Sequence, residues 1–417
     1  MNLLFLVPCI PKINGVGWEQ RAFHFLKSYS QVAEIDLICI NFGKTPVDEV
    51  EYLHLTNMCR SVQLFRVDQA IATSSFVQNI QRIFTLSPLF STVAPSQMFT
   101  ESFKKQIIEA DFIHASRLEI FCFLPRGTWS RTLLDLDECH VTTLRRSQRF
   151  NSSMSLGERL QSLIRYVDTF RIAYYQKYVT KRVCAAFICS EVERNRVSSS
   201  SQLQVLPNAV KSLSHFPNKV DSQQKRLLFI GNLSTSPNID AAVYFVTYIW
   251  KKVLKQYSTC RLMIVGRNPC DQILALAGSE GIEIHANVAD LDEVYQNATI
   301  AIVPLRFGAG TKLKLLEAFG YGVPVVTTSI GSEGIDVQND KHLLVADSPE
   351  AFAEACLCLL SEPETCQRLA LAAWQYTRKN HDATAIQQMI TTRFSDLASM
   401  AATQTPEIPQ KKLRLFN

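Results

Sequence analysis

One stretch of the chain, residues 303–326, combines glycine, lysine and glutamate side chains in an order that can bind a phosphorylated sugar. After an apolar strand and a glycine-rich turn, we expect a helix to begin at Thr311, with Lys312 and Lys314 in its first turn. The free N–H groups and the dipole of a helix N-terminus attract an anion, and glycines let the backbone approach it. Glu317 follows, and a single carboxylate there suits sugar hydroxyls better than a phosphate. Together these parts fit a nucleoside diphosphate that carries a sugar.

The same stretch also has an ordinary structural interpretation. Gly320 and Gly322 are expected to end the helix, and a β-branched strand is expected at residues 323–328. A basic helix start after a glycine turn is common in α/β proteins that bind no nucleotide. The local pattern alone leaves both interpretations open.

Composition limits the class of protein. A chain of 417 residues can form two or three domains, and a net charge of +5 does not by itself indicate nucleic acid binding. The twelve cysteines are scattered, without the C-x-x-C pairs of a zinc site, so reduced thiols are the simplest account. No apolar segment is long enough to cross a bilayer, and residues 3–10 lack the pattern of a signal peptide. We expect a cytoplasmic protein, or one held peripherally on the cytoplasmic face of a membrane.

Apolar strands alternate with helical stretches along the whole chain, which predicts an α/β fold with parallel sheets. In the first half, strands are expected at residues 3–7, 35–40, 112–113, 132–134, 185–189 and 203–206, with a helix at 18–30. In the second half, strands are expected at residues 227–230, 261–265, 282–284, 299–303, 325–328 and 343–345. Helices are expected there at residues 239–254, 349–360, 363–379 and 384–400.

This alternation divides the chain into two Rossmann-like halves. We expect a first domain at residues 1–205 and a second at residues 206–384, with a polar linker at 211–224. The polar tail at residues 401–417 is expected to be loose beyond its first residues. Every candidate site residue follows a strand, and ligands of such sheets bind beyond the carboxyl ends of the strands.

The second half resembles the family 4 glycosyltransferases, which are retaining nucleotide-sugar enzymes of GT-B fold. The matching blocks are residues 205–210 (VLPNAV), 229–232 (FIGN), 264–267 (IVGR) and 303–331. Weaker matches in the first half lie at residues 15–17, 111–114 and 189–191. The resemblance implies two Rossmann-like domains that face each other across a cleft. It also implies that the C-terminal helix, at about residues 385–400, crosses back to the N-terminal domain.

The resemblance assigns most of the donor site to the C-terminal half. Glu317 would hold the ribose hydroxyls, while Lys312 and the amides of Gly310 and Thr311 would hold the diphosphate. The base would lie near residues 287–288, beside Val288. The remaining donor-side residues are Gly15, Gly17, Gly231, Asn232, Gly266 and Gly308.

Four side chains are predicted to act in catalysis, namely Glu317, Lys312, Arg267 and His114. Arg267 would face the phosphates or the sugar, and His114 would contact the sugar or the acceptor, although a lone histidine is often structural. On the acceptor side the candidates are Arg117, Asp137 and Glu19, of which Glu19 can also simply complement a helix dipole.

The sequence departs from the family pattern at two places. Family members often carry a second glutamate eight residues before the one that matches Glu317, where this chain has Ala309. They also often carry a lysine shortly after the block that contains Gly231, but residues 232–238 include none. Lys312 or Arg267 would then compensate more of the phosphate charge.

These residues predict a metal-independent glycosyltransferase that retains the anomeric configuration. A helix N-terminus with Lys and Arg can stabilise the leaving diphosphate without a metal or other cofactor, and that phosphate would help take the acceptor proton. The donor would be a nucleoside diphosphate sugar, by default a UDP-sugar. The acceptor would be a hydroxyl of a lipid-linked sugar, a glycan or a small molecule, in glycan, glycolipid or glycoconjugate biosynthesis. Two alternatives stay open, a GT-B nucleotide-sugar epimerase and a catalytically weak nucleotide-sugar-binding partner protein.

Two further segments have competing interpretations. Residues 135–138 (DLDE) resemble an acidic metal-binding motif, but their place in the acceptor half favours a cleft-edge or helix-capping cluster. Residues 141–182 are basic and aromatic, which fits either contact with an anionic membrane or a long core helix with a solvated basic face. No motif supports nucleic acid as a partner.

Overall fold

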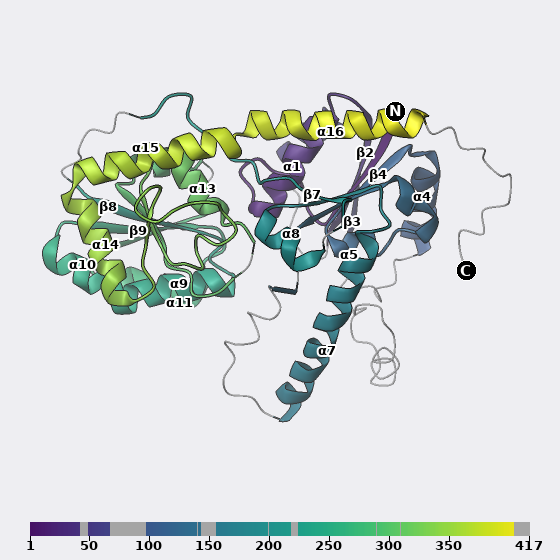
Figure 1. Ribbon diagram of the computed structural model, residues 1–417. Coiled ribbons are helices and arrows are strands. Elements are labelled where there is room, and N and C mark those ends of the chain that lie inside the picture. The colour runs from purple at the N-terminus through teal and green to yellow at the C-terminus, as the bar shows by residue number, and fades with distance from the viewer. Residues whose placement is uncertain are drawn as a thin grey trace. The chain divides into compact units, whose positions relative to one another are not determined.

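The computed structural model describes residues 1–41, 49–66, 97–139, 141–142, 156–198, 200–217, 224–288, 290–308 and 310–403. The chain divides into two compact units (Figure 1). The N-terminal unit contains Met1–Pro207 and Thr384–Asn417, and the C-terminal unit contains Asn208–Ala383. In the described residues, no helix is both long enough and apolar enough to cross a membrane.

The N-terminal unit is built on a parallel sheet whose strand order is β3-β2-β1-β4-β5-β6-β7. The order changes direction between β1 and β4, which is the switch point where ligands of such sheets bind. The strands are β1 (Asn2–Val7), β2 (Glu34–Asn41), β3 (Ser61–Arg66), β4 (Phe112–Ser116), β5 (Thr132–Asp137), β6 (Ala185–Ile188) and β7 (Leu203–Val205). The helices are α1 (Gly17–Tyr29), α2 (Glu49–Thr56), α4 (Gln97–Glu109), α5 (Leu118–Phe121), α7 (Leu156–Val179), α8 (Glu191–Val197) and α16 (Ala383–Thr403), with a 3₁₀ turn at Arg126–Arg131.

The C-terminal unit has a second parallel sheet, with the order β10-β9-β8-β11-β12-β13. Its strands are β8 (Arg226–Ile230), β9 (Arg261–Gly266), β10 (Ile282–Ala286), β11 (Ile300–Val303), β12 (Val325–Thr327) and β13 (Leu344–Val345). Its helices are α9 (Ser236–Phe245), α10 (Lys251–Gln256), α11 (Asp271–Leu274), α12 (Asp292–Asn297), α13 (Leu313–Gly320), α14 (Pro349–Ser361) and α15 (Pro363–Asn380). A π-helical turn at Val246–Trp250 joins α9 to α10 where the sequence predicts one uninterrupted helix.

Helix α16 packs on the N-terminal unit, as predicted. The side-chain amide of Gln387 lies 2.9 Å from His24 Nδ1, and the ring centroid of Phe394 lies 4.8 Å from that of Tyr29 and 5.6 Å from that of Phe112. The return of the C-terminal helix to the first unit is therefore fixed by polar and aromatic contacts (Figure 1).

The predicted linker needs a correction over residues 211–217. Leu213 N donates to Gly320 O at 3.0 Å, and Trp374 Nε1 donates to Leu213 O at 3.2 Å. The rings of Phe216 and Trp374 meet edge to face, with centroids 5.8 Å apart. These residues are thus packed on α13 and α15, because their backbone groups and one aromatic ring find partners there. Residues 218–223 and the predicted tail beyond Thr403 lie outside the described residues.

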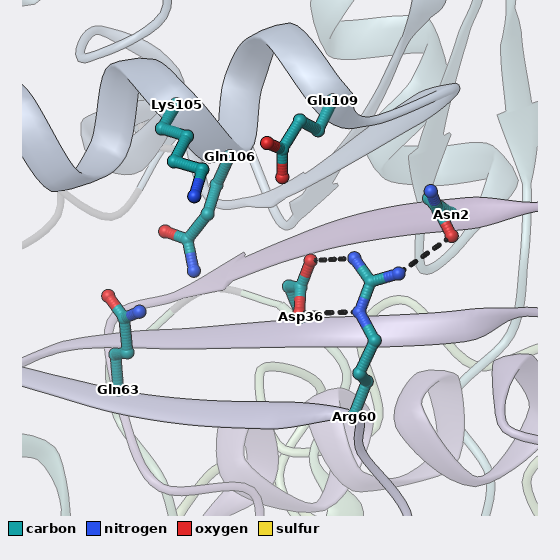
Figure 2. A pocket seen from close by; sticks show the side chains of 7 residues that line it. All are labelled: Asn2, Asp36, Arg60, Gln63, Lys105, Gln106 and Glu109. Atoms are coloured by element: carbon teal, nitrogen blue, oxygen red, sulfur yellow. Dashed lines mark hydrogen bonds and ion pairs between the residues drawn. The ribbon is translucent and has the colours of Figure 1, made fainter.

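A polar hollow of about 670 Å³ lies in the N-terminal unit, toward the amino ends of its strands (Figure 2). Its lining residues are Asn2, Asp36, Arg60, Gln63, Lys105, Gln106 and Glu109. Arg60 donates to the Asp36 carboxylate from Nε at 3.2 Å, and Ser61 Oγ donates to it at 2.6 Å. The hollow contains none of the predicted site residues, which follow the carboxyl ends of strands.

A buried ion pair ties α1 to β5 in the same unit. Arg21 donates to Asp135 through Nε (to Oδ2, 2.8 Å) and NH2 (to Oδ1, 2.7 Å), and through NH1 to Leu206 O at 2.9 Å. Both side chains are 4% exposed. A bidentate Arg–carboxylate pair of this kind fixes orientation as well as supplying attraction. Asp135, the first residue of the acidic run 135–138, is therefore engaged by Arg21.

Removal of one partner of this pair should destabilise the protein strongly. We expect Asp135→Ala to lower the free energy of unfolding by about 3–5 kcal/mol, because the buried Arg21 would lose its bidentate partner and keep only Leu206 O and the Asp137 carboxylate at 3.7 Å. Glu34→Ala removes an exposed partner of Arg60 and should cost less than about 1 kcal/mol. Urea denaturation of both variants measures this, and equal losses would contradict the role of the buried pair.

Candidate functional site

The loops after β8 and β9 run together at the carboxyl ends of these strands. Gly231 N donates to Val265 O at 3.1 Å, and Leu233 N donates to Arg267 O at 2.8 Å. A Cβ atom on Gly266 would lie 1.7 Å from Gly231 O, so only glycine fits at position 266. The structure thus brings the predicted residues Gly231, Gly266 and Arg267 to one place.

The loop after β10, which is predicted to face the base, joins the same group. Asn287 N donates to Gly266 O at 2.8 Å, and Asn287 Oδ1 accepts from Asn268 N at 3.1 Å. Val288 is half-buried and packs against the core of this unit. The predicted base loop is therefore held beside the loop after β9.

The glycine turn before α13 has the backbone geometry that glycine favours. Gly308 and Gly310 have φ angles of 130° and 70°. Lys312 is 8% exposed, and its Nζ donates to Gly310 O at 2.6 Å. The lysine ammonium thus lies folded over the turn that is predicted to hold the diphosphate.

Two boundaries predicted for this stretch are wrong. Helix α13 begins at Leu313 and not at Thr311, because Lys312 is the N-cap residue and its ψ of 91° is outside the helical range. The following strand is shorter than predicted, at Val325–Thr327. Ala309, where the family often has its earlier glutamate, lies outside the described residues.

The hydroxyl of Thr311 is buried in this turn without a partner. Its Oγ1 makes no hydrogen bond to the described part of the protein. A buried polar atom left unpaired costs about 1–3 kcal/mol of stability. Thr311 therefore presents a polar atom that a bound ligand could satisfy.

Glu317 is held in place by an aromatic pair. Tyr295 OH, from α12, donates to Glu317 Oε2 at 2.9 Å. The Tyr295 ring stacks on Tyr321, with centroids 4.8 Å apart and planes 7° from parallel, and Tyr321 OH donates to Asp292. The carboxylate of Glu317 is thus oriented by a second helix and is half-buried.

Lys314, predicted to lie in the first turn of this helix, also reaches residues of β8 and α9, and the sequence did not predict these contacts. Its Nζ donates to Asn238 Oδ1 at 2.6 Å and lies 4.7 Å from the Phe229 ring centroid. A Cβ atom on Gly231 would stand 2.9 Å from this Nζ, so the ammonium reaches the turn after β8. Burial lowers the pKa of Lys314 to about 7, an effect that Glu317 opposes and that Lys312 increases. Asn238 lies in the first turn of α9, and residues 232–238 include no lysine of their own.

In the N-terminal unit, three of the predicted residues form the start of α1. Glu19 Oε2 accepts from Val16 N at 2.8 Å, which caps the helix. A Cβ on Gly15 would lie 2.5 Å from Glu19 Cβ, and Gly17 is the first residue of α1. Glu19 and Gly15 therefore have structural roles here, and their contact with donor or acceptor, like that of Gly17, stays a prediction.

The prediction that His114 is catalytic needs correction. Its side chain is fully buried, with Nδ1 2.9 Å from Tyr29 OH and Nε2 3.3 Å from Ser116 Oγ. The rings of Phe5 and Phe25 pack on it with centroids 4.7 and 4.5 Å away. Burial lowers the pKa of His114 to about 3, so the ring is a neutral part of the core and presents no nitrogen to a substrate.

Arg117 follows β4 and Asp137 is the last residue of the neighbouring strand β5, and both have left-handed backbones, with φ of 73° and 60°. Such strain costs about 1–3 kcal/mol and often occurs at functional sites. Arg117 Nε lies 3.6 Å from Glu119 Oε2. Burial raises the pKa of Asp137 to about 6, although the positive charge of Arg21 opposes this shift. Their acceptor-side role stays a prediction.

The basic and aromatic segment 141–182 contains α7. In its described second half, Ile172 and Val179 belong to the core, whereas Phe170 and Tyr174 are exposed. Residues 143–155 lie outside the described residues. The core contacts support a packed helix, and contact of this segment with a membrane stays a prediction.

Comparison with known proteins identifies the type of domain. Residues 224–362 match the family model "Glycosyl transferases group 1". An uncharacterized 44.6 kDa protein in the cps region of Klebsiella pneumoniae is 28% identical over 187 residues, which are 43% of this chain and 48% of that protein. The match thus spans about half the length of that relative.

Solved structures share the fold over nearly the whole chain. A sucrose-phosphate synthase from Thermosynechococcus elongatus has a TM-score of 0.66 and 14% identity, covering 96% of this chain and all of that one. HepE from Anabaena, in complex with UDP-glucose, has a TM-score of 0.61 and 14% identity, covering 95% of this chain and all of that one. The predicted GT-B fold and the resemblance to group 1 glycosyltransferases are therefore confirmed.

The buried state of His114 predicts a pH dependence of stability. In the folded protein its pKa is about 3, against an ordinary 6.5, so below pH 6.5 the unfolded chain binds a proton that the folded chain does not. The resulting stability is complete above pH 6.5 and is lost as the pH falls toward 3.

Between pH 6 and 4, the free energy of unfolding of the unmodified protein should fall faster than that of His114→Gln, by up to about 1.4 kcal/mol per pH unit. His24 is present in both proteins, so its contribution cancels. His285→Gln, which changes an exposed ring, should follow the unmodified protein. Urea denaturation at stepped pH measures these slopes, and parallel curves for the His114 variant and the unmodified protein would contradict the burial of His114.

Proposed function

We propose that this chain, a GT-B protein with a group 1 glycosyltransferase domain, transfers a sugar from a nucleoside diphosphate sugar to an acceptor hydroxyl. The observation that carries the proposal is the buried hydroxyl of Thr311, which has no hydrogen-bond partner among the described residues and stands in a glycine turn beside a folded-over lysine. A diphosphate oxygen bound there would accept from Thr311 Oγ1 and face the start of α13. The same turn, in the matched domain, supplies the positive charge that such a ligand needs.

In this proposal, the Glu317 carboxylate accepts hydrogen bonds from the ribose hydroxyls of the donor. A carboxylate accepts hydrogen bonds from two adjacent hydroxyls, and Tyr295 holds that of Glu317 in one orientation. A UDP-sugar is the favoured donor, and the likeness to HepE, whose structure contains UDP-glucose, supports this choice.

The chemistry follows from the charge that develops on the donor. As the bond from the anomeric carbon to the diphosphate breaks, negative charge grows on the leaving oxygens, where the helix start, Lys312 and Lys314 can stabilise it. The acceptor oxygen bonds to the anomeric carbon on the face that the diphosphate leaves, and its proton passes to a leaving phosphate oxygen. This step retains the anomeric configuration and needs no metal.

The epimerase alternative loses its main support. Epimerisation at the sugar needs carboxylates and a histidine near the anomeric centre. His114, the histidine considered for that role, is fully buried, and its two nitrogens are engaged by Tyr29 and Ser116. Sugar transfer therefore fits the described side chains better.

A thermal-shift screen with UDP, GDP and dTDP tests the donor site through Thr311. A ligand at about 100 times its dissociation constant should add about 2.7 kcal/mol to the free energy of unfolding. Thr311→Val removes the unpaired hydroxyl, so without ligand it should be at least as stable as the unmodified protein. It should nevertheless bind the nucleotide about 10–100-fold more weakly, because a hydrogen bond to a charged group is lost.

The chain offers a matched control for this variant. Thr377 Oγ1, on α15, is also buried and unpartnered within the described residues, but it lies outside the predicted site. Thr377→Val should bind the nucleotide like the unmodified protein, whereas Glu317→Gln should bind it weakly. Equal affinity of Thr311→Val and the unmodified protein, or no shift with any nucleotide, would refute the donor site.

Turnover tests the reaction itself. With a UDP-sugar and a panel of glycan, lipid-linked and small-molecule acceptors, we expect UDP release that depends on an acceptor and is unchanged in excess EDTA. Loss of activity in EDTA that a divalent ion restores would overturn metal independence. Nucleotide binding with no turnover on the whole panel would instead favour the binding-partner alternative.

A further inference from the structure

The ammonium of Lys314 lies where three separate segments of the C-terminal unit meet, beside the predicted donor site. Lys314 lies on α13, Phe229 lies in β8, and Asn238 lies at the start of α9. Its hydrogen bond goes to a neutral amide oxygen, Asn238 Oδ1, at 2.6 Å. The group that this cation faces most closely therefore carries no compensating charge.

Asn238 is fixed so that its oxygen points to the lysine. Its Nδ2 donates to Asn232 O and to Thr235 Oγ1, both at 3.0 Å. The amide nitrogen is thereby used within the loop, which leaves Oδ1 for Lys314. The missing side chain of Gly231 keeps the space beside Nζ open, since a Cβ there would approach it to 2.9 Å.

The charged groups described near this ammonium come from α13 and the residue just before it, whereas β8 and α9 supply uncharged groups. Glu317, on the same helix, favours its charged form, and Lys312, just before the helix, disfavours it. From the other elements come the Phe229 ring, the Gly231 backbone and the Asn238 amide. A diphosphate at the Gly231 turn would add an anion in direct contact with Nζ, where the described residues place only the neutral Asn238 amide.

We propose that the donor diphosphate binds together with a proton, which Lys314 takes up to become the ammonium that pairs with the phosphates. This inference rests on the proposed function and adds a pH control to it. Donor affinity then depends on whether the lysine amine is already protonated.

The direction of the effect follows from the lysine in the free protein, whose pKa is about 7. At pH 6 the amine is already charged, so donor binding takes up little proton. At pH 8 most of it is neutral, and an anion that raises its pKa makes binding take up close to one proton per site. Donor affinity should fall by up to about tenfold per pH unit above pH 7.

Isothermal titration calorimetry with UDP-glucose tests the inference on the full chain. Titrations at pH 6 and pH 8, each in two buffers of different ionisation enthalpy, give the number of protons taken up. UDP-glucose is a suitable probe because its diphosphate is esterified at both ends and does not titrate in this range. We expect uptake of nearly one proton at pH 8 and little at pH 6.

Three variants locate the proton. Lys314→Arg carries a permanent charge, so it should bind with no uptake and with affinity that no longer falls with pH. Lys314→Met is neutral at every pH and should bind at least tenfold more weakly than the unmodified protein at pH 6, also with no uptake. Lys255→Arg, on the exposed side of α10, is the matched control and should behave like the unmodified protein. Circular dichroism and urea denaturation check that each variant is folded.

The two proposals fail in different ways. Binding of UDP-glucose without proton uptake at pH 8, or uptake that persists in folded Lys314→Arg and Lys314→Met, overturns the role of Lys314 and leaves the donor site intact. Absence of binding by UDP-glucose, GDP-mannose and dTDP-glucose to the unmodified protein refutes the donor site, and this inference with it.

Discussion

The backbones that follow β8 and β9 approach each other so closely that position 266 has no room for a side chain. A Cβ there would lie 1.7 Å from Gly231 O. Because Asn287 N donates to Gly266 O, this contact also fixes the loop after β10. Helix α13 adds a fourth segment, through the hydrogen bond from Lys314 to Asn238. One close backbone approach thus helps to fix the positions of the residues that are predicted to contact the phosphate, sugar and base.

Near this contact, two polar groups of the ligand-free protein are incompletely paired within the described residues, which lowers its stability. Thr311 Oγ1 is buried and has no partner in the part of the chain that the structure describes, and the Lys314 ammonium faces a neutral amide. Both groups can gain from one diphosphate, because it accepts from the hydroxyl and neutralises the ammonium. The binding energy of a donor would therefore come from groups that are already placed and only partly satisfied.

The sequence predicted the sheets well where strands are buried on both faces, as in the continuous apolar run of β1. It missed β3, an edge strand (SVQLFR) whose polar residues break the apolar run. It also placed the start of α13 two residues early, because the extended ψ of Lys312 depends on the fold of the turn.

Local motifs predicted the glycine turn that contains Gly310 and the helix that carries Glu317, while their contacts with a donor stay a prediction. The position of Lys314 was not predictable, since its partner Asn238 is 76 residues away and only the packing of α13 on the β8 loop joins them. His114 matched a motif position, but its environment is set by Phe5, Phe25 and Tyr29, which converge from separate elements. Contacts between elements decide whether such a side chain serves a ligand or the core.

The central claim is that the turn before α13 and the loop after β8 together bind a nucleoside diphosphate. A crystal structure of the full chain with UDP tests it most directly. The account predicts a diphosphate within hydrogen-bond distance of Thr311 Oγ1 and Lys314 Nζ, with the ribose hydroxyls on Glu317. UDP bound elsewhere, with these three side chains making no contact to it, would contradict the account.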